Sequence, residues 1–469
     1  MTGQKKKRGA APKADETLLI RGALRLARMD DTRSEVADGD VLIEGGVIKA
    51  VGTRLGAKAD RIIDARGCVV LPGFVNTHHH LYQTLTRNLP AVQDHKLFDW
   101  LLYLYEVWRQ VTPEDVFVSA QVGLGELLLT GCTTSSDHFY VFPGGRSADL
   151  IDQEIEGARA LGIRFHACRG SMSRGKSKGG LPPDDVVQSE DEILRDSERL
   201  VKAYHDRSSR AMTRIALAPC SPFSVTTELL KLTAQMAQKW DVRLHTHLAE
   251  TLDEEDFCLQ LFKMRPLAYM ESAGWLEGGR SWFAHCVHCS RAESKLMGAT
   301  RTGVAHCPSS NLRLGSGIAP LRMYLDDKVP VGLGVDGSAS NDCSAMLLEA
   351  RMAMLVARVK SGVASMPARD ALWAATRGGA EVLGRDDIGE LSPGKAADLS
   401  VFDLSGIDFA GSLCDPVAAV LFCGASHKAK HVVVNGKIVV EDGRLSRLDE
   451  GALARRANSL SAKLLERAA

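Results

Sequence analysis

The segment PGFVNTHHH (residues 72–80) ends a short apolar run with two histidines that lie two positions apart. Successive side chains of an extended chain point to opposite sides, so we expect His78 and His80 to face one way and His79 the other. Imidazoles placed like this at the end of a strand are typical of a metal site. The pair alone is also compatible with a hydrogen-bonded structural turn, so the interpretation depends on the rest of the chain.

Three further segments end apolar runs with polar groups in the same way. They are RLHTHLAE with His247 and Glu250, SWFAHC with His285, and VPVGLGVDG with Asp336. A fold that gathers several strand ends in one place would bring these groups together. His245 shares a strand face with His247, so the ligand in this segment is ambiguous, although the H-x-x-E context favours His247.

Eight apolar runs alternate with amphipathic helical stretches through the middle of the chain. The runs are LPGFVNT, TTSSD, IRFHACRG, RIALAPCS, VRLHTHLAE, SWFAHCV, TGVAHCPSS and VPVGLGVDG. The helices are expected at 113–130, 149–161, 190–206, 226–239, 255–273, 290–300, 344–361 and 367–383. Eight strand–helix units predict an α/β fold of the (β/α)8 TIM-barrel type, in which chemistry lies at the carboxyl ends of the strands. The polar groups described above all fall at such ends.

The two ends of the chain share a different pattern, with short strands broken by Gly and Asp. This pattern in 17–70 and 386–445 predicts one small β-sandwich domain built from both ends, outside a barrel domain spanning 71–385. Residues 1–16 hold a basic cluster with no apolar run after it, which predicts a disordered tail rather than a secretory signal. Residues 446–469 are expected to form a C-terminal helix.

The composition excludes several classes of protein. The hydrophobic fraction of 45% and the charged fraction of 25% are those of a soluble globular protein. Lys plus Arg equals Asp plus Glu, at 58 each, so no net field favours nucleic acid or an acidic membrane. No apolar stretch is long enough to cross a bilayer. The 11 cysteines are scattered and odd in number, which indicates free thiols in a reducing cytoplasm.

Taken in order, PGFVNTHHH, HTHLAE, AHC and GVDG resemble the amidohydrolase superfamily, in particular its mononuclear metal-dependent deaminase branch. The motifs HHHLYQTLTR, TTSSDHFYVFPGG, FHACRG, APCSPFSV and GVDGSASND are most similar to those of 8-oxoguanine deaminases. The resemblance implies one divalent ion with four ligands: His78, His80, His247 and Asp336. It also implies catalytic roles for Glu250 and His285.

The chemistry of these residue types agrees with that resemblance. Replacing an amine on a purine-like ring needs a strong nucleophile, and a divalent ion lowers the pKa of bound water from about 16 toward about 7. Three imidazoles and one carboxylate suit Zn²⁺ best, with Fe²⁺ as the alternative. We expect Asp336 also to accept the proton of the water, His285 to polarise the water, and Glu250 to act as general acid and base. The leading reaction is 8-oxoguanine plus water to uric acid plus ammonia.

The fourth apolar run lacks a residue that two-metal members of this superfamily carry. Two-metal cyclic amidases have a carboxylated lysine at the end of strand four. Here that run ends APCSPFS, with Cys220 and Ser221 and no lysine. We therefore expect one metal per chain, and deamination rather than ring opening.

Four side chains are expected to contact the substrate. Gln83 can pair with a ring carbonyl and N–H, and Arg169, at the end of the third strand, can donate two hydrogen bonds to an oxo group. Tyr140 after the second strand and Trp100 in the long loop after the first can stack on a flat ring. An ion pair at the barrel rim explains Arg169 equally well, and plain packing explains the two aromatics.

Several alternatives stay open. Isoxanthopterin or another pterin, or a hydroxytriazine, fits the same motifs as a substrate. A non-catalytic scaffold of the same fold is the remote alternative, because scaffolds usually lose ligands and none is lost here. We expect a small purine-like heterocycle as the partner, no nucleic acid or membrane, and a homo-oligomer of two or more chains, as in relatives of the superfamily.

Overall fold

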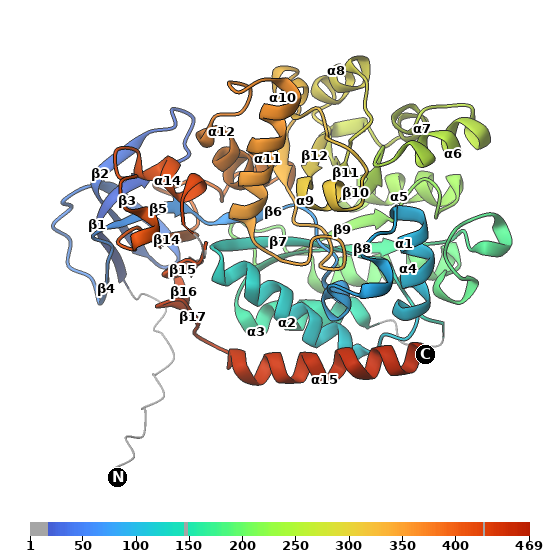
Figure 1. Ribbon diagram of the computed structural model, residues 1–469, viewed down its shortest axis with the longest axis horizontal. Coiled ribbons are helices and arrows are strands. Elements are labelled where there is room, and N and C mark those ends of the chain that lie inside the picture. The colour runs from blue at the N-terminus through green and yellow to red at the C-terminus, as the bar shows by residue number, and fades with distance from the viewer. Residues whose placement is uncertain (1–16, 145–148, 425–426) are drawn as a thin grey trace, which may run out of the picture.

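The computed structural model describes residues 17–144, 149–424 and 427–469. A parallel barrel surrounded by helices occupies one side of the molecule, and a separate sheet lies at the other side (Figure 1). The predicted fold class is therefore confirmed. The predicted basic tail, residues 1–16, lies outside the described residues.

Eight strands close the barrel, and each pairs in parallel with its neighbours. In chain order they are β6 (Phe74–Asn76), β7 (Cys132–Phe139), β8 (Arg164–Ser171), β9 (Thr213–Pro219), β10 (Arg243–Leu248), β11 (Ser281–His285), β12 (Gly303–His306) and β13 (Val331–Leu333). Leu333 of β13 pairs with Asn76 of β6 and closes the ring. Because the strands are parallel, their carboxyl ends share one mouth, where barrels of this kind carry their chemistry.

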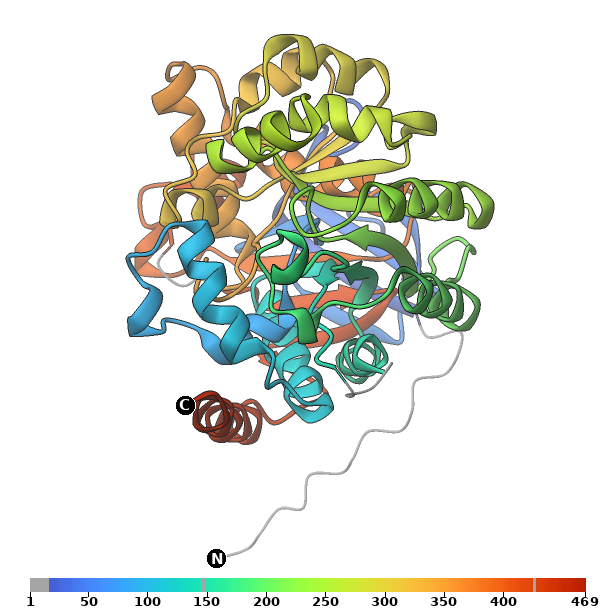
Figure 2. The same cartoon turned by 90° about the vertical axis from the view of Figure 1, so that its right-hand side faces the viewer.

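Helices cover the outside of the barrel, as the green and yellow ribbons of Figure 2 show. They are α2 (Pro113–Leu129), α3 (Leu150–Leu161), α4 (Glu190–Tyr204), α5 (Thr227–Trp240), α6 (Leu252–Phe262), α7 (Pro266–Ser272), α8 (Arg291–Ala299), α9 (Pro308–Arg313), α10 (Leu321–Asp326), α11 (Met346–Ser361), α12 (Ala368–Trp373) and α13 (Gly379–Val382). Each of the eight predicted helical stretches overlaps at least one of them.

Two details differ from the prediction. The stretch 255–273 forms two helices, because Lys263 adopts a left-handed φ of 59° at the end of α6 and Pro266 starts α7. The connection after β6, predicted as a long loop, contains helix α1 (Leu97–Trp108), and Trp100 lies on it.

Both ends of the chain build the second sheet. Its strands are β1 (Thr17–Ala27), β2 (Glu35–Glu44), β3 (Val47–Thr53), β4 (Arg61–Asp64), β5 (Cys68–Pro72), β14 (Leu399–Asp403), β15 (His431–Val434), β16 (Lys437–Glu441) and β17 (Arg444–Leu445). The two ends meet where β5 pairs antiparallel with β14. Apolar side chains from both ends, including Ile20, Val41 and Leu399, form a core of their own. Only Gly73 separates β5 from β6, so this sheet fixes the start of the first barrel strand.

The chain ends in two further helices. Helix α14 (Pro416–Phe422) follows the sheet strand β14, and α15 (Glu450–Ala468) lies along α2 in both views (Figures 1 and 2). Ser461 on α15 donates a hydrogen bond to the Leu85 carbonyl (2.7 Å), which ties this helix to the segment after the first barrel strand. Within the described ranges, no helix has the length and apolar character needed to span a membrane.

Candidate functional site

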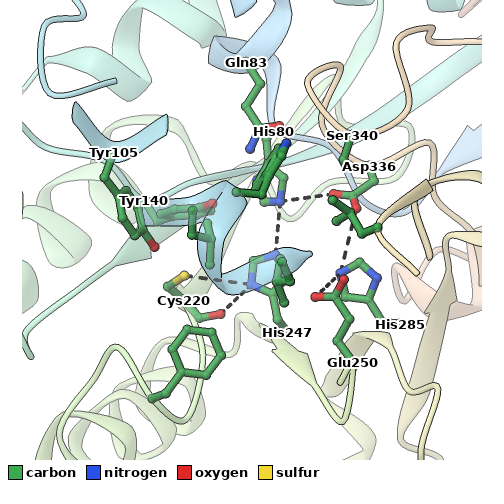
Figure 3. Close-up of a pocket in the computed structure, with 15 residues that line it drawn as sticks. His80, Gln83, Tyr105, Tyr140, Cys220, His247, Glu250, His285, Asp336 and Ser340 are labelled. Carbon is green, nitrogen blue, oxygen red and sulfur yellow. Dashed lines mark hydrogen bonds and ion pairs between the residues drawn. The ribbon is translucent and has the colours of Figure 1, made fainter. Parts of the chain in front are cut away.

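The predicted ligand and catalytic residues lie together at the carboxyl mouth of the barrel. Figure 3 labels all of them except His78. His78 and His80 follow β6, and His247 is the next-to-last residue of β10. Glu250 follows β10, His285 ends β11, and Asp336 follows β13. His79 points elsewhere, with its Nε2 atom 3.0 Å from Ser344 Oγ, as the alternation of side chains predicted.

Three nitrogen atoms and one carboxylate oxygen face one another at this mouth. His80 Nε2 lies 3.1 Å from His247 Nε2, and Asp336 Oδ1 lies 3.2 Å from His78 Nε2 and 3.3 Å from His80 Nε2. Donor atoms on a tetrahedron with bonds of about 2.0–2.1 Å lie about 3.3–3.4 Å apart, which is close to these spacings. The buried Nε2 atom of His78 has no hydrogen-bond partner. Among the described residues, side chains that could hold a metal form two overlapping groups: His78, His80, His138 and His247 in one, and His78, His285 and Asp336 in the other. The spacings among the predicted ligands are compatible with one divalent ion that His78 would share between the groups.

The Nδ1 atoms of these histidines set which nitrogen carries the proton. His80 Nδ1 donates to the His138 carbonyl (2.7 Å), and His247 Nδ1 donates to the Cys220 carbonyl (2.6 Å). With the proton on Nδ1, the lone pair of Nε2 faces the centre, as a metal ligand requires. Burial also lowers the pKa of His247 well below its ordinary value, which keeps the ring neutral.

His245 supports the centre from below instead of facing it. Its Nδ1 donates to the Trp282 carbonyl (2.9 Å), so its Nε2 accepts a hydrogen bond from His78 Nδ1 (2.7 Å). This relay leaves His78 Nε2 unprotonated toward the centre. The ambiguity between the two histidines of β10 is thereby explained: both point inward, but His245 lies two residues deeper in the barrel.

His285 carries its proton on the other ring nitrogen, Nε2. Asn311 Nδ2 donates to His285 Nδ1 (2.9 Å), which places the proton on Nε2. That Nε2–H lies 3.5 Å from Glu250 Oε2 and 3.9 Å from Asp336 Oδ2. Burial lowers the pKa of His285 to about 4, so the ring is a neutral donor at pH 7. A donor in this position suits hydrogen bonding to a water or a substrate atom.

The turn that carries Glu250 is held in an unusual conformation. Ala249 has a left-handed φ of 51°, and the carboxylate of Glu254 accepts the N–H groups of Ala249 (2.8 Å) and Glu250 (3.1 Å). Ser316 Oγ donates to Glu250 Oε1 (3.2 Å). Burial raises the pKa of Glu250 well above its ordinary value, so its carboxyl group keeps a proton to higher pH.

A pocket opens over this centre, and unpaired polar atoms line it. Gln83, Trp100 and Tyr140, three of the four predicted substrate contacts, are among its walls, together with Tyr105. Gln83 Oε1, Trp100 Nε1 and Tyr105 Oη are buried without a hydrogen-bond partner among the described residues. Buried polar atoms without partners are costly, so their presence here indicates a ligand with complementary polar edges.

The amide of Gln83 depends on a glycine in the GVDG segment. A Cβ atom at Gly337 would lie 1.8 Å from Gln83 Oε1, so any side chain there would displace the amide. The glycine that follows Asp336 therefore leaves room for Gln83 beside the centre.

Comparison with known proteins places the chain in a family. Residues 69–439 match the model of the Amidohydrolase family. The chain belongs to the amidohydrolase family. It is 49% identical over 433 residues to an 8-oxoguanine deaminase from Pseudomonas aeruginosa, covering 92% of this chain and 96% of that one. It is 35% identical to an isoxanthopterin deaminase from an unknown prokaryotic organism, over 93% and 94% of the two chains.

The structural comparison agrees with the sequence comparison. The crystal structure of atrazine chlorohydrolase from Arthrobacter aurescens in complex with zinc superimposes on this amidohydrolase with a TM-score of 0.91. The two sequences are 39% identical, and the match covers 95% of this chain and 100% of the other.

Arg169, the fourth predicted substrate contact, does not line the pocket of this amidohydrolase. Its guanidinium group donates to Asp196 (2.9 Å), to Gln188 (2.8 Å) and to the Gly170 carbonyl, and it lies over the Phe142 ring. All of its nitrogens are thus engaged within the protein. Arg169 therefore forms an ion pair with Asp196, which was the alternative to substrate binding.

Replacing Arg169 with Met is expected to lower stability rather than alter substrate choice. Removing one partner of a buried ion pair leaves Asp196 uncompensated on that side, which typically costs about 3 kcal/mol of unfolding free energy. Urea denaturation measures this loss, and KM values for an oxo-purine and for a less oxygenated ring should change by the same factor. A KM increase confined to the oxo-purine would contradict this and show that Arg169 contacts the substrate.

The amidohydrolase site also contains residues that the sequence did not indicate. Tyr105 lines the pocket from α1, and Glu254 holds the Glu250 turn. His138, the next-to-last residue of β7, donates from Nε2 to the Ala218 carbonyl (2.8 Å) and stacks on His247. Their only sequence signal was proximity to a strand end or an apolar helix, which many structural residues share.

Proposed function

We propose that this amidohydrolase deaminates 8-oxoguanine hydrolytically, giving uric acid and ammonia. The observation that carries the proposal is the convergence of three imidazole lone pairs and a carboxylate beneath a pocket with unpaired polar atoms. The relative at 49% identity, an 8-oxoguanine deaminase that matches nearly the whole chain, supports this substrate.

We infer that His78, His80, His247 and Asp336 hold one divalent ion. Zn²⁺ is the proposed ion, supported by the nitrogen-rich donor set and by the zinc-containing structural relative, and Fe²⁺ is the alternative. When bound, such an ion lowers the pKa of a coordinated water and so supplies a nucleophile at neutral pH.

The chain's own residues then handle the protons of the reaction. Asp336 Oδ2 lies 3.9 Å from His285 Nε2, on the side of the carboxylate where it can accept the proton that the water gives up. His285 Nε2–H donates to the attacking oxygen and holds it toward the ring. Protonated Glu250 gives its proton to the ring nitrogen next to the amino-bearing carbon. The proton that Asp336 accepted then passes to the departing amine, and Glu250 takes back a proton from the former water oxygen as the carbonyl forms.

Substrate recognition is assigned to the pocket walls. We propose that the Gln83 amide pairs with a ring carbonyl and N–H, and that Trp100 and Tyr140 pack against the flat heterocycle. Tyr140 meets the His80 ring edge-on, with centroids 5.1 Å apart, which fixes this wall against the centre. An oxidised purine offers carbonyl and N–H groups on both edges and satisfies these atoms better than a plain hydrocarbon ring.

A substrate panel tests the proposal directly. Zinc-loaded protein is assayed for ammonia release with 8-oxoguanine, isoxanthopterin, guanine and hydroxyatrazine side by side. We expect kcat/KM for 8-oxoguanine to exceed the others by at least about 100-fold, since a site built around hydrogen bonds rejects analogues that lack them. A preference for isoxanthopterin or hydroxyatrazine would show that the proposed substrate is wrong, although the protein would still be a hydrolase of the same class. Metal-loaded protein inert toward all four would favour the scaffold alternative.

We also propose where the enzyme acts and how it assembles. All eleven cysteines are free and most are buried, which supports a reducing cytoplasm as its location. We also propose a role in purine breakdown and a homo-oligomer of two or more chains. Size-exclusion chromatography with light scattering measures the assembly, and a monomer at all concentrations would contradict it.

A further inference from the structure

A second cavity lies at the opposite end of the barrel from the candidate metal centre. It has a volume of about 280 Å³, and arginines from the amino ends of adjacent strands line it. Arg214 is the second residue of β9, Arg243 is the first residue of β10, and Arg280 directly precedes β11. Because these strands are parallel, their amino ends lie away from the mouth that holds His247 and His285. The two cavities are therefore separate sites.

The charges around this cavity are unbalanced. Four guanidinium groups line it, from Arg207, Arg214, Arg243 and Arg280, against the single carboxylate of Asp241. Asp241 pairs with Arg280 (2.8 Å). The other three donate hydrogen bonds to main-chain carbonyl oxygens, and none of the three forms an ion pair with a carboxylate of the described residues. Three positive charges thus share the cavity without a neutralising partner.

Three carboxylates act on Arg214 from a distance, those of Asp387, Asp386 and Asp206, but none lies within ion-pair distance of it. Asp387 accepts hydrogen bonds from Arg385 (2.7 and 2.8 Å) and from the Arg210 main chain, and Asp206 accepts one from the Ser208 main chain. Burial and the charges of Arg280 and Arg214 lower the pKa of Arg243 to about 10. Like charges held this close repel one another unless an anion lies between them.

A buried histidine in the wall supplies an independent sign of a ligand. His166 on β8 is 2% exposed and lines the cavity, yet neither of its ring nitrogens has a hydrogen-bond partner among the described residues. The buried Nε atoms of Arg214 and Arg243 also lack partners. Unpaired buried donors are costly, so several in one cavity indicate an occupant that brings hydrogen-bond acceptors.

We propose that this cavity is a binding site for a small phosphate-bearing anion. Guanidinium groups match phosphate oxygens with paired hydrogen bonds, and a dianion balances the unpaired charges better than a single carboxylate does. At about 280 Å³ the cavity is far larger than the roughly 10–15 Å³ that holds one water. That is enough for a phosphate group carrying a small substituent. The site is independent of which heterocycle the enzyme deaminates.

Calorimetric titration of the full-length, metal-loaded protein tests the site. The probes are inorganic phosphate, sulfate and AMP, with ionic strength held constant by NaCl. We expect saturable binding of phosphate at one per chain and a rise in Tm that saturates over the same range. Tighter binding of AMP would identify an organic phosphate as the better ligand, and equal binding would favour the free ion. Heat or Tm changes no greater than those in NaCl alone would overturn the proposal.

Variants distinguish binding from a structural role. Arg214→Gln is expected to weaken phosphate binding at least tenfold, and in the absence of phosphate its Tm should not fall, because a repelling charge has gone. Arg207→Gln, an exposed position at the rim, gives a second test if the first variant does not fold, with a smaller loss of about threefold. Arg455→Gln, an exposed arginine on α15, is the matched control and should bind as the parent does. Unchanged affinity in both cavity variants would refute the site.

Discussion

Glu250→Gln is expected to lower kcat for deamination by about 10²- to 10⁴-fold while leaving metal content unchanged, because general acid–base groups contribute about that much. Gln has the same shape as Glu, so the hydrogen bond from Ser316 Oγ (3.2 Å) to Oε1 can persist. The amide cannot release a proton to the ring nitrogen. Steady-state kinetics and metal analysis on one preparation measure both quantities.

The expected pH dependence follows from the direction of the Glu250 pKa. Burial, followed by the charges of Asp336 and Glu254, raises the pKa of Glu250, so the protonated, donating form persists toward neutral pH and activity should fall as pH rises through the raised value. Glu250→Gln should lose this alkaline limb.

A neighbouring acid provides the matched control for this variant. Asp253→Asn, an exposed change three residues along the chain, should leave kcat within about twofold of the parent, as surface changes usually do. Parental turnover in Glu250→Gln would exclude Glu250 from proton transfer. Loss of metal in Glu250→Gln would instead mean that this carboxylate helps to hold the ion.

The barrel and the set of converging residues could be predicted because both depend on local rules. Alternation of side chains puts His78 and His80 on one side, and the barrel brings every strand's carboxyl end to one mouth. These two rules suffice to collect His247, His285 and Asp336 from distant parts of the sequence. Neither rule needs to know how side chains pack.

The same rules could not predict how deep in the barrel each side chain lies. His245 and His247 share a face, and the alternation cannot state which imidazole reaches the centre. The structure separates them by their partners: His247 bonds the Cys220 carbonyl at the strand end, whereas His245 bonds Trp282 and His78 farther inside. Sequence position along a strand predicts a face but not a hydrogen-bond network.

The side chains that line the pocket could not be predicted reliably, because their positions depend on tertiary contacts between distant segments. Arg169 stands at a strand end like the ligands, but Asp196 on α4 captures its guanidinium group. Trp100 was predicted within a loop and lies on α1, which also brings Tyr105 to the pocket. Asp196 and Arg169 are 27 positions apart, and their pairing depends on how α4 packs on β8.

Asp336→Ala is expected to abolish measurable deamination and to weaken metal binding by more than about 100-fold, since loss of a residue that merely orients a ligand already costs about 10- to 100-fold. Asp336 Oδ1 lies 3.2 Å from His78 Nε2 and 3.3 Å from His80 Nε2, so its removal opens one side of the donor set. Metal content after dialysis and competition with a chelator measure the affinity, and ammonia release measures activity.

Asp342→Asn tests whether the effect of Asp336→Ala is specific to the centre and not to its loop. Asp342 lies six residues farther on, also has a left-handed φ (65°), and bonds the Asn88 main chain and Arg313 instead of the histidines. Asn tolerates that backbone conformation, so this variant should keep its metal and most of its turnover. Equal metal loss in both variants would attribute the effect to the loop, and full metal content in Asp336→Ala would remove this carboxylate from the ligand set. Because the three imidazoles keep their own partners, the Asp336→Ala protein should fold normally, which circular dichroism verifies.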